Sequence, residues 1–341
     1  MIDLRSLELP ALEKLCNEFN IPKFRAKLLF SWLHKIGAQC FDEMSNIPKN
    51  LKEKLQEQYY ISTCEIERKL ESQIDDTVKY LFKLHDGEFI ESVVMKYKHG
   101  WSICVSTQVG CAMGCKFCAS TKGGRKRNLT AGEIANQIYV AGRDLNFRIS
   151  NIVLMGMGEP LDNYDNVMTF LWLISSENGV NIGMRHISLS TCGVVPKMHE
   201  LEKENLQLTL SVSLHAPTDE IRSQMMPVND RWGISEVINA CKSYIAKTNR
   251  RISFEYSVVQ GVNDSDECAL KLASLLKGML CHVNLIPVNT IKEGGFVRPD
   301  KQRIKQIENI LLSKGINTTI RRTLGSDISA SCGQLRGEKI N

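Results

Sequence analysis

Three cysteines that lie close together are the residues of this sequence best suited to chemistry. Cys111, Cys115 and Cys118 are separated by three and two residues, which places three thiol groups in one tight loop. A structural zinc site normally takes four protein ligands, and this loop offers three. An iron–sulfur cluster held by three cysteines leaves one iron atom open to an external ligand. The spacing therefore favours such a cluster over a zinc knuckle or three packed thiols.

S-adenosylmethionine (SAM) has an amino and a carboxylate group that can bind such an open iron atom. A reduced cluster can then pass an electron to the sulfonium group and release a 5′-deoxyadenosyl radical. Three later segments suit a bound sulfonium nucleoside, although each alone could be an ordinary turn at the end of a strand. In Gly156–Pro160 the glycines allow close approach of the backbone and Glu159 can accept from an ammonium group. The other two segments are Ser190-Thr191 and Ser213-Leu214-His215.

Short apolar strands alternate with helical segments from Trp101 onward. Repeats of this length predict an α/β fold, a parallel sheet with crossover helices that curls into a full or partial barrel. In such folds the active site gathers at the carboxyl ends of the strands, where the cysteine loop and the three segments fall. The expected strands are 103–106, 151–155, 186–190, 208–214, 252–258, 282–287 and 318–321, and the expected helices lie near 130–145, 163–176, 233–247, 265–277 and 300–314.

The residues before these repeats divide into a helical part and a hairpin. Apolar residues recur at helical spacing in two stretches of the first sixty residues, and 50–58 predicts a third, charged helix. Residues 77–84 and 89–95 are rich in strand-forming residues and flank His85-Asp86-Gly87-Glu88, which is typical of a hairpin turn. We therefore expect a helical accessory domain at 1–60, a β-hairpin linker region at 61–98, and a core with a C-terminal tail at 99–341.

The composition is that of an ordinary globular protein, with 43% apolar and 24% charged residues. A formal net charge of +5 permits a polyanionic partner without requiring one. The segment Lys122–Arg127 is a local basic patch, for which a solvated surface is the default interpretation. No apolar run is long enough to cross a membrane, and the N-terminus lacks the pattern of a signal peptide. We expect a cytoplasmic protein without a membrane partner.

The chain resembles the radical SAM RNA methyltransferases of the RlmN/Cfr family, and within it the branch that acts on carbon 2 of adenine. The resemblance covers essentially the whole length. It implies a radical SAM partial (β/α)6 barrel with a small N-terminal helical accessory domain of the helix-hairpin-helix type. The segments that carry it, besides the N-terminal module, are 104–118, Gly156–Pro160, Ser213–His215, Asn284–Asn289 and Asp327–Leu335.

The resemblance also implies roles for individual residues. Cys111, Cys115 and Cys118 would hold one 4Fe–4S cluster. Cys332 would be the cysteine that is itself methylated, and Cys104 would be its partner. The residues implied around SAM are Gly158, Glu159, Ser190, Ser213, Leu214, His215 and Asn289.

Carbon 2 of adenine is electron-poor and cannot attack the methyl group of SAM as a nucleophile. In the mechanism that the resemblance implies, the Cys332 thiolate first takes the methyl group from one SAM molecule. A radical from a second SAM removes a hydrogen atom from this S-methyl group, and the resulting methylene radical adds to the adenine. Cys104 then attacks the sulfur of Cys332, which releases methylated RNA and forms a disulfide. Glu91, on the same strand face as Val93, is the expected acceptor of the ring proton.

The implied substrates are an adenosine in the peptidyl-transferase region of 23S ribosomal RNA and the adenosine 3′ of the tRNA anticodon. The target adenine must be unstacked to reach the cluster. We expect phosphate contacts at Lys122–Arg127, at Arg321 and Arg322, and on the N-terminal helices. We also expect an electron donor such as flavodoxin or ferredoxin, and a monomeric enzyme.

Three other functions stay open from the residues alone. Enzymes of the same family that act on carbon 8 share the cysteines, so the choice of carbon 2 depends on matches such as Pro160. A radical SAM enzyme for a small metabolite or peptide would keep the cluster but would not need Cys104, Cys332 or the N-terminal module. A non-enzymatic RNA-binding protein would use the thiols for a structural metal.

Overall fold

The N-terminal residues form a small helical module. The computed structural model describes residues 1–98, 100–289 and 295–335, so the core boundary that we predicted at residue 99 lies outside the described residues. Two short parallel strands, one near each end of the module, bring its ends together. The elements are β1 (Ile2–Asp3), α1 (Leu9–Glu18), α2 (Phe24–Ser31), a π-helical turn (Trp32–Ile36), α3 (Lys49–Gln58) and β2 (Tyr59–Tyr60).

The three predicted N-terminal helices are present, and the reasons lie in the sequence. In α1 the spacing of Leu12, Leu15 and Cys16 places three apolar side chains on one face, and all three are buried. Pro10 lies in the first turn of this helix, where a missing N–H group costs no hydrogen bond. The third helix begins after Pro48, in agreement with the expectation from 50–58.

Four antiparallel strands follow the module. The predicted hairpin is confirmed: β4 and β5 pair with each other, and Gly87 takes the positive φ of +85° that their tight turn requires. A further strand, β3, pairs with β4 and was not predicted, because its charged sequence lacks an apolar alternation. The bounds are β3 (Cys64–Glu71), β4 (Val78–Leu84), β5 (Phe89–Tyr97) and β6 (Gly100–Cys104).

The remaining strands are parallel and are joined by helices on the outside. The predicted strands and helices of this region are confirmed to within three residues at each end. Two short helices, α6 and α7, were not predicted. The elements are α4 (Ala131–Leu145), β9 (Ile149–Leu154), α5 (Tyr164–Ser175), β10 (Ile187–Thr191), α6 (Val195–Leu201), β11 (Thr209–Ser213), α7 (Asp219–Met225), α8 (Ile234–Thr248), β12 (Ile252–Val258), α9 (Asp266–Leu276), β13 (Cys281–Pro287), α10 (Lys301–Ser313) and β14 (Thr318–Ile320).

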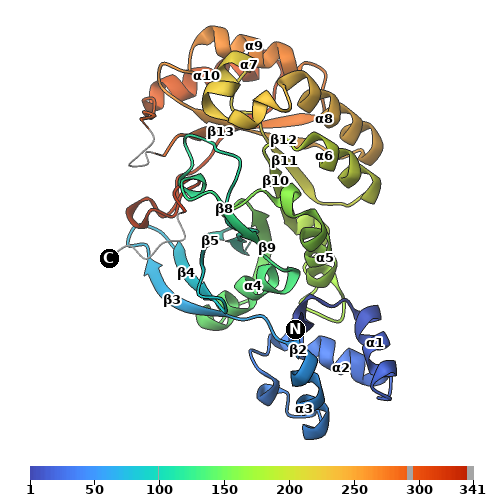
Figure 1. Ribbon diagram of the computed structural model, residues 1–341. Helices are drawn as coiled ribbons and strands as arrows, with labels where there is room; N and C mark the ends of the chain where they lie inside the picture. The colour runs from blue at the N-terminus through green and yellow to red at the C-terminus, as the bar shows by residue number, and fades with distance from the viewer. Residues whose placement is uncertain (99, 290–294, 336–341) are drawn as a thin grey trace.

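The strands join into one mixed sheet of ten strands within the described residues, in the order β14-β13-β12-β11-β10-β9-β6-β5-β4-β3. Its two edges, β14 and β3, do not pair there, so the sheet forms a partial barrel. Six parallel strands of that part of the chain, β6 and β9 to β13, are each followed by a helix, as a (β/α)6 arrangement requires. Figure 1 shows the red C-terminal segment beside β3 and β4.

A short hairpin is inserted between the first parallel strand and α4. Its strands, β7 (Gln108–Gly110) and β8 (Arg125–Asn128), pair outside the main sheet. The loop between them contains the three clustered cysteines. The hairpin therefore holds this loop at the carboxyl end of β6 and beside β9.

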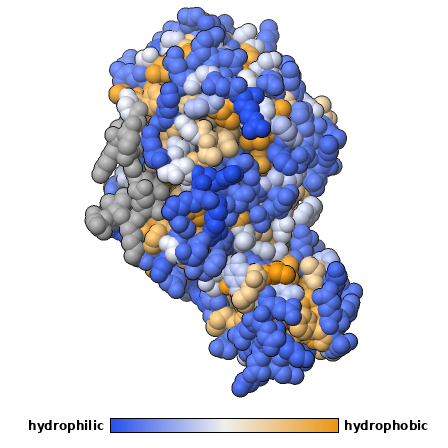
Figure 2. Space-filling view, in the orientation of Figure 1, coloured by the Kyte–Doolittle hydropathy of each residue, from blue (hydrophilic) through white to orange (hydrophobic). Residues whose placement is uncertain are grey.

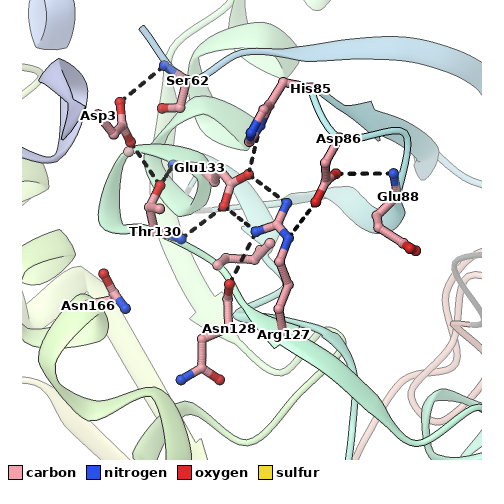
Figure 3. Close-up of polar contacts among 12 residues, drawn as sticks. Asp3, Ser62, His85, Asp86, Glu88, Arg127, Asn128, Thr130, Glu133 and Asn166 are labelled. Carbon is pink, nitrogen blue, oxygen red and sulfur yellow. Dashed lines mark hydrogen bonds and ion pairs between the residues drawn. The ribbon is translucent and has the colours of Figure 1, made fainter. Parts of the chain in front are cut away.

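The N-terminal module is joined to the core by buried polar contacts. Asp3 accepts hydrogen bonds from the backbone N–H of Ser62 (3.1 Å) and from the hydroxyl of Thr130 (2.8 Å), as Figure 3 shows. Thr130 also caps α4 in a capping box with Glu133. The fully buried Arg5 donates to three backbone carbonyl groups of its own module and its linker. The module is thus fixed at the start of α4 (Figure 1).

Most of the face shown in Figure 2 is hydrophilic, with apolar surface on the N-terminal module. The exposed apolar side chains of this module include Ile2, Phe24 and Ile36. Among the described residues we find no helix with the length and apolar character needed to cross a membrane.

Candidate active site

A cavity of about 150 Å³ opens at the carboxyl ends of the parallel strands. This is where strand–helix folds place their active sites, because the loops that follow the strands converge there. All three cysteines of the predicted cluster line it, together with the predicted residues Gly158, Glu159, Ser190, Ser213, His215 and Asn289 and with Cys332.

The cysteine loop is held in shape by its own hydrogen bonds. The backbone N–H of Cys111 donates to Gly124 (3.0 Å), and the hydroxyl of Thr121 donates to the carbonyl groups of Cys115 (3.1 Å) and Cys118 (2.9 Å). Burial raises the pKa of Cys111 to about 12 and raises the pKa of the other two thiols as well. Without a metal these thiols are therefore protonated at neutral pH, and iron would bind them as thiolates.

The residues present fit a 4Fe–4S cluster with an open iron atom. The loop supplies three soft sulfur donors on one wall of a cavity. Among the described residues, no group of three or more His, Cys, Asp or Glu side chains converges on a single ion position. A cubane cluster binds each cysteine through a different iron atom, so its ligands need not converge on one point.

Gly158 and Glu159 form a polar wall of the same cavity. Gly158 has a φ of +103°, and a Cβ atom there would lie 2.6 Å from Gln108, so a side chain would not fit. The buried carboxylate of Glu159 accepts from the backbone N–H groups of Leu161 (3.0 Å) and Cys192 (2.8 Å). These bonds fix its orientation, while burial raises its pKa. Its remaining lone pairs can accept hydrogen bonds from the ammonium group of a ligand.

His215 is held in one tautomer. Its Nδ1 accepts from the backbone N–H of Ser257 (2.8 Å), which leaves the hydrogen on Nε2. Burial, and then the nearby Arg222, lower the pKa of His215 to about 3, so the ring is neutral. The neighbouring Leu214 was also predicted as a cofactor contact. Its side chain is fully buried and does not line the cavity, so a contact through its backbone stays a prediction.

Arg222 was not predicted and is the main connection between two of the strand ends. It is fully buried and donates to the carbonyl oxygens of Cys192 after β10 and of Ser213 and Leu214 at the end of β11. It lies on α7, one of the two helices that the sequence analysis missed. The residues around Arg222 in the sequence are mostly polar, so nothing indicated that it is buried. Arg222 therefore positions the strand ends that carry Ser213 and His215.

A second, smaller cavity adjoins the first and is lined by Cys104 and Cys332. Cys332 lines both cavities, so it lies between the three-cysteine loop and Cys104. Burial, and then the nearby Cys332, raise the pKa of Cys104 to about 12. The side-chain amide of Asn289 donates to the carbonyl oxygen of Cys332 (3.1 Å) and holds this segment in place.

Arg321, where we predicted a phosphate contact, faces the two cavities, and the phosphate contact stays a prediction. Its guanidinium group lines both cavities and lies 3.6 Å from the carboxylate of Glu255. Interaction with Cys332 is the main cause that raises the pKa of Arg321. A phosphate contact was expected at Arg321 and at the adjacent Arg322. The first of them points into the barrel, and Arg322 lines the smaller cavity.

Glu91 is buried on the face of the sheet where we expected it, but it has a partner that was not predicted. Its carboxylate lies 3.0 Å from the ammonium group of Lys79 on β4. The side chain of Glu91 lines neither of the two cavities described above. Pairing across strands depends on register, so Lys79 could not be identified from the sequence.

The basic segment Lys122–Arg127 is largely neutralised by carboxylates. Arg127 binds Asp86 in the turn between β4 and β5 and Glu133 in the first turn of α4, as Figure 3 shows. Lys126 and Arg125 bind acidic side chains as well. Such cations are poorly placed to bind phosphate groups as well. The ion pairs are Arg125–Asp162, Lys126–Glu88 (2.7 Å), Arg127–Asp86 (2.6 Å) and the two-pronged Arg127–Glu133 (2.8 and 2.9 Å).

Comparison with known proteins agrees with this geometry. Residues 105–273 match the radical SAM superfamily, and residues 2–61 match the ribosomal RNA large subunit methyltransferase N-terminal domain. A protein of Clostridium tetani named "Probable dual-specificity RNA methyltransferase RlmN" is 56% identical over 98% of this chain and 96% of its own length. A protein of Alkaliphilus oremlandii with the same name is 54% identical over 99% of this chain and 98% of its own length.

A solved structure shows the same fold over nearly the whole chain. The crystal structure of a radical SAM methyltransferase from Sphaerobacter thermophilus superposes with a TM-score of 0.95 and 43% sequence identity, over 99% of this chain and 100% of that chain. With the two family matches and the identity to the curated relatives, this places the chain plainly: it belongs to the RlmN-type radical SAM methyltransferase family.

Proposed function

We propose that this enzyme methylates carbon 2 of an adenosine in 23S ribosomal RNA and of the adenosine 3′ of the tRNA anticodon. The names of the curated relatives support a dual-specificity RNA methyltransferase. The single observation that carries the proposal is the position of Cys332, which borders both the three-cysteine cavity and the cavity of Cys104. A methyl carrier must reach the cofactor, the substrate and a resolving thiol in turn, and this position suits it to all three.

Cys111, Cys115 and Cys118 would hold the 4Fe–4S cluster. SAM would lie against Gly158, Glu159, Ser190, Ser213, His215 and Asn289, with two molecules used per turnover. When bound, the cluster and SAM supply a radical that can remove a hydrogen atom from a methyl group. In this arrangement Glu159 accepts from the ammonium group of the ligand, and the neutral His215 donates from Nε2.

Cys332 acts as the methyl carrier in this proposal. Its sulfur takes the first methyl group as a thiolate, beside Arg321, which lines the same two cavities. Asn289 keeps the segment docked through the Cys332 carbonyl group. Once the carrier is bound to the adenine, Cys104 attacks the sulfur of Cys332, so that the RNA leaves and a disulfide forms between the two cysteines. Glu91 takes the proton from the adenine ring.

The rest of the chain has supporting roles in the proposal. The domain of residues 1–60 contacts RNA, the region 61–98 links it to the core, and the core with its tail spans 99–341. An electron donor such as flavodoxin or ferredoxin reduces the cluster. The enzyme acts as a monomer in the cytoplasm, where ribosomal and transfer RNA are found.

Anaerobic reconstitution followed by incubation with RNA tests the proposal. Digestion of the RNA should place the new methyl group on carbon 2 of adenine, and a peptide containing Cys332 should gain the mass of one methyl group. Methylation of RNA by a Cys332→Ala protein would contradict the role of Cys332. A methyl group on carbon 8 would correct the position, and SAM cleavage without RNA methylation would favour a small-molecule or peptide substrate.

A further inference from the structure

A buried lysine joins the proposed proton acceptor to the segment that carries Cys332. The ammonium group of Lys79 lies 3.0 Å from Oε1 of Glu91, and the two side chains are only 8% and 5% exposed. The same ammonium group donates to the carbonyl oxygen of Ser329, at 3.1 Å. One cation therefore contacts both the carboxylate and the backbone three residues before Cys332.

The register of the sheet places these groups on the face that carries Cys104. Lys79 pairs with Val93 across β4 and β5, and Val93 pairs with Cys104 across β5 and β6. Directly opposed residues of antiparallel strands project to the same face of a sheet. Glu91 lies two residues before Val93 and shares that face. Lys79, Glu91 and Cys104 are therefore on one side of the sheet.

The tail that carries Cys332 is fastened against this side at several points. Asp327 accepts from the hydroxyl of Ser72 and from the backbone N–H of Gln73, both at 2.8 Å, at the turn between β3 and β4. Ser329, the partner of Lys79, has a φ of +50°, a left-handed conformation that costs energy for a residue with a side chain. The contact with Lys79 lies at this bend, so it helps to hold the tail in a conformation that the backbone alone does not favour.

The charges of this face explain why a lysine is needed there. A buried carboxylate group is costly unless an opposite charge and hydrogen bonds compensate for the lost water, and such a partner also fixes its orientation. Lys79 supplies that charge at hydrogen-bond distance. Glu255 has a comparable partner in Arg321, at 3.6 Å.

We propose that Lys79 is a positioning residue for methyl transfer: its ammonium group holds the Glu91 carboxylate in place and holds the Cys332 segment next to it. The inference rests on Glu91 being the proton acceptor of the proposed function. In that step the C–H bond breaks, the proton moves to the carboxylate and the bonding electron pair stays with the ring. The unpaired electron left by the radical addition must pass to a one-electron acceptor, a role that the oxidised iron–sulfur cluster would fill. Lys79 then keeps the carbonyl group of Ser329 as its partner, so the tail stays docked.

The test follows three quantities in reconstituted holoenzyme with RNA: methylation of the Cys332 peptide, covalent enzyme–RNA adduct on a denaturing gel, and methylated adenine. In Lys79→Met, Cys332 should be methylated as in the wild type. The adduct should accumulate, and methylated adenine should form at least about ten-fold more slowly, a part of the 10²–10⁴-fold that a general base contributes. Lys79→Arg keeps the charge and should restore most of the product.

Lys69→Met is the matched control. Lys69 lies on β3 opposite Tyr80 and therefore on the other face of the same sheet. It forms ion pairs with Glu71 (2.8 Å) and Asp144 (2.9 Å), so its removal also breaks ion pairs of a strand lysine. This variant should form methylated adenine as the wild type does. Lys79→Gln, which is neutral but still a hydrogen-bond donor, replaces Lys79→Met if the latter does not fold.

The outcomes separate this inference from the proposed function. If Glu91→Gln methylates RNA at the wild-type rate, the role of Glu91 in the proposed function is wrong. If Glu91→Gln blocks the reaction while Lys79→Met and Lys79→Gln react as the wild type, only the role of Lys79 is wrong. In Lys79→Met the tail keeps its contacts through Asn289 and Asp327, so loss of Cys332 methylation there would overturn the assignment of Lys79 to the later proton transfer. Adding Lys79→Met to Glu91→Gln should cause a much smaller loss than Lys79→Met causes alone, because only the contact with Ser329 is left to lose.

Discussion

Replacement of Arg222 by methionine tests how the strand ends of the active site are held. The guanidinium group is fully buried and makes five hydrogen bonds: to the carbonyl oxygens of Cys192 (2.6 Å), Ser213 (3.2 Å), Leu214 (3.1 Å) and Trp232 (3.2 Å), and to the side chain of Asn229 (3.0 Å). Methionine fills similar space but donates no hydrogen bond, so these buried oxygens lose their partner.

The expected loss of stability follows from these contacts. A buried acceptor that loses its donor costs about 1 kcal/mol or more, which gives about 5 kcal/mol for five oxygens. About 2 kcal/mol is regained because the variant no longer buries a positive charge. We therefore expect Arg222→Met to lower the free energy of unfolding by about 3 kcal/mol.

Urea unfolding of the protein without cofactors, measured anaerobically, checks this value. Arg231→Met is the control, because Arg231 follows the same helix, is exposed and packs on the ring of Trp232 at 4.5 Å. It should cost less than about 1 kcal/mol. If Arg222→Met is no more destabilising than the control, the buried arginine does not hold the strand ends and the reasoning is refuted.

Three further predictions concern the thiol of Cys104, the cap of α4 and the buried His34. Cys104→Ser should leave Cys332 methylation intact and trap the enzyme covalently on RNA, seen as a slow band on a denaturing gel; free turnover would contradict the resolving role. Thr130→Ala should lower stability by about 1–2 kcal/mol, measured by thermal unfolding, because it removes both the cap of α4 and the hydrogen bond to Asp3, whereas Thr130→Ser should be nearly neutral. Burial lowers the pKa of His34 to about 3 from 6.5. The unfolded chain therefore binds a proton below pH 6.5 that the folded chain does not, and stability falls as the pH falls from 6.5 towards 3. Between pH 7 and pH 5, His34→Gln should lose about 2 kcal/mol less stability than the wild type, and an equal loss in both proteins would count against this assignment.

The strands and helices of the core could be predicted because their sequences repeat a simple pattern. Apolar runs such as that of β12 alternate with amphipathic segments such as α8, and each has only one way to bury its apolar residues. β3 could not be predicted in this way. It lies at an edge of the sheet and most of its residues are exposed, so charged residues are tolerated there and no alternation marks the strand.

The site was predictable only where its residues lie close together in the sequence or match a known family. The three-cysteine loop needed no structure, because its spacing alone indicates a cluster. Cys104 and Cys332 line one cavity because the C-terminal tail packs against the sheet that carries Cys104. Only the resemblance to the family indicated this proximity. The buried partners, Lys79 for Glu91 and Arg222 for the ends of β10 and β11, depend on register and on a short helix. Neither leaves a signal in the sequence.

The neutralised basic segment has a consequence for how the proposed RNA partner would be held. When a free cation binds a phosphate group, condensed counterions are released from the nucleic acid. The logarithm of the association constant for a single strand therefore falls with the logarithm of the salt concentration, with a slope of about 0.7 per contact. Arg125, Lys126 and Arg127 already hold carboxylates, so they release few counterions. The slope would instead count the cations elsewhere on the surface, and it would be smaller than the number of basic residues in this segment suggests.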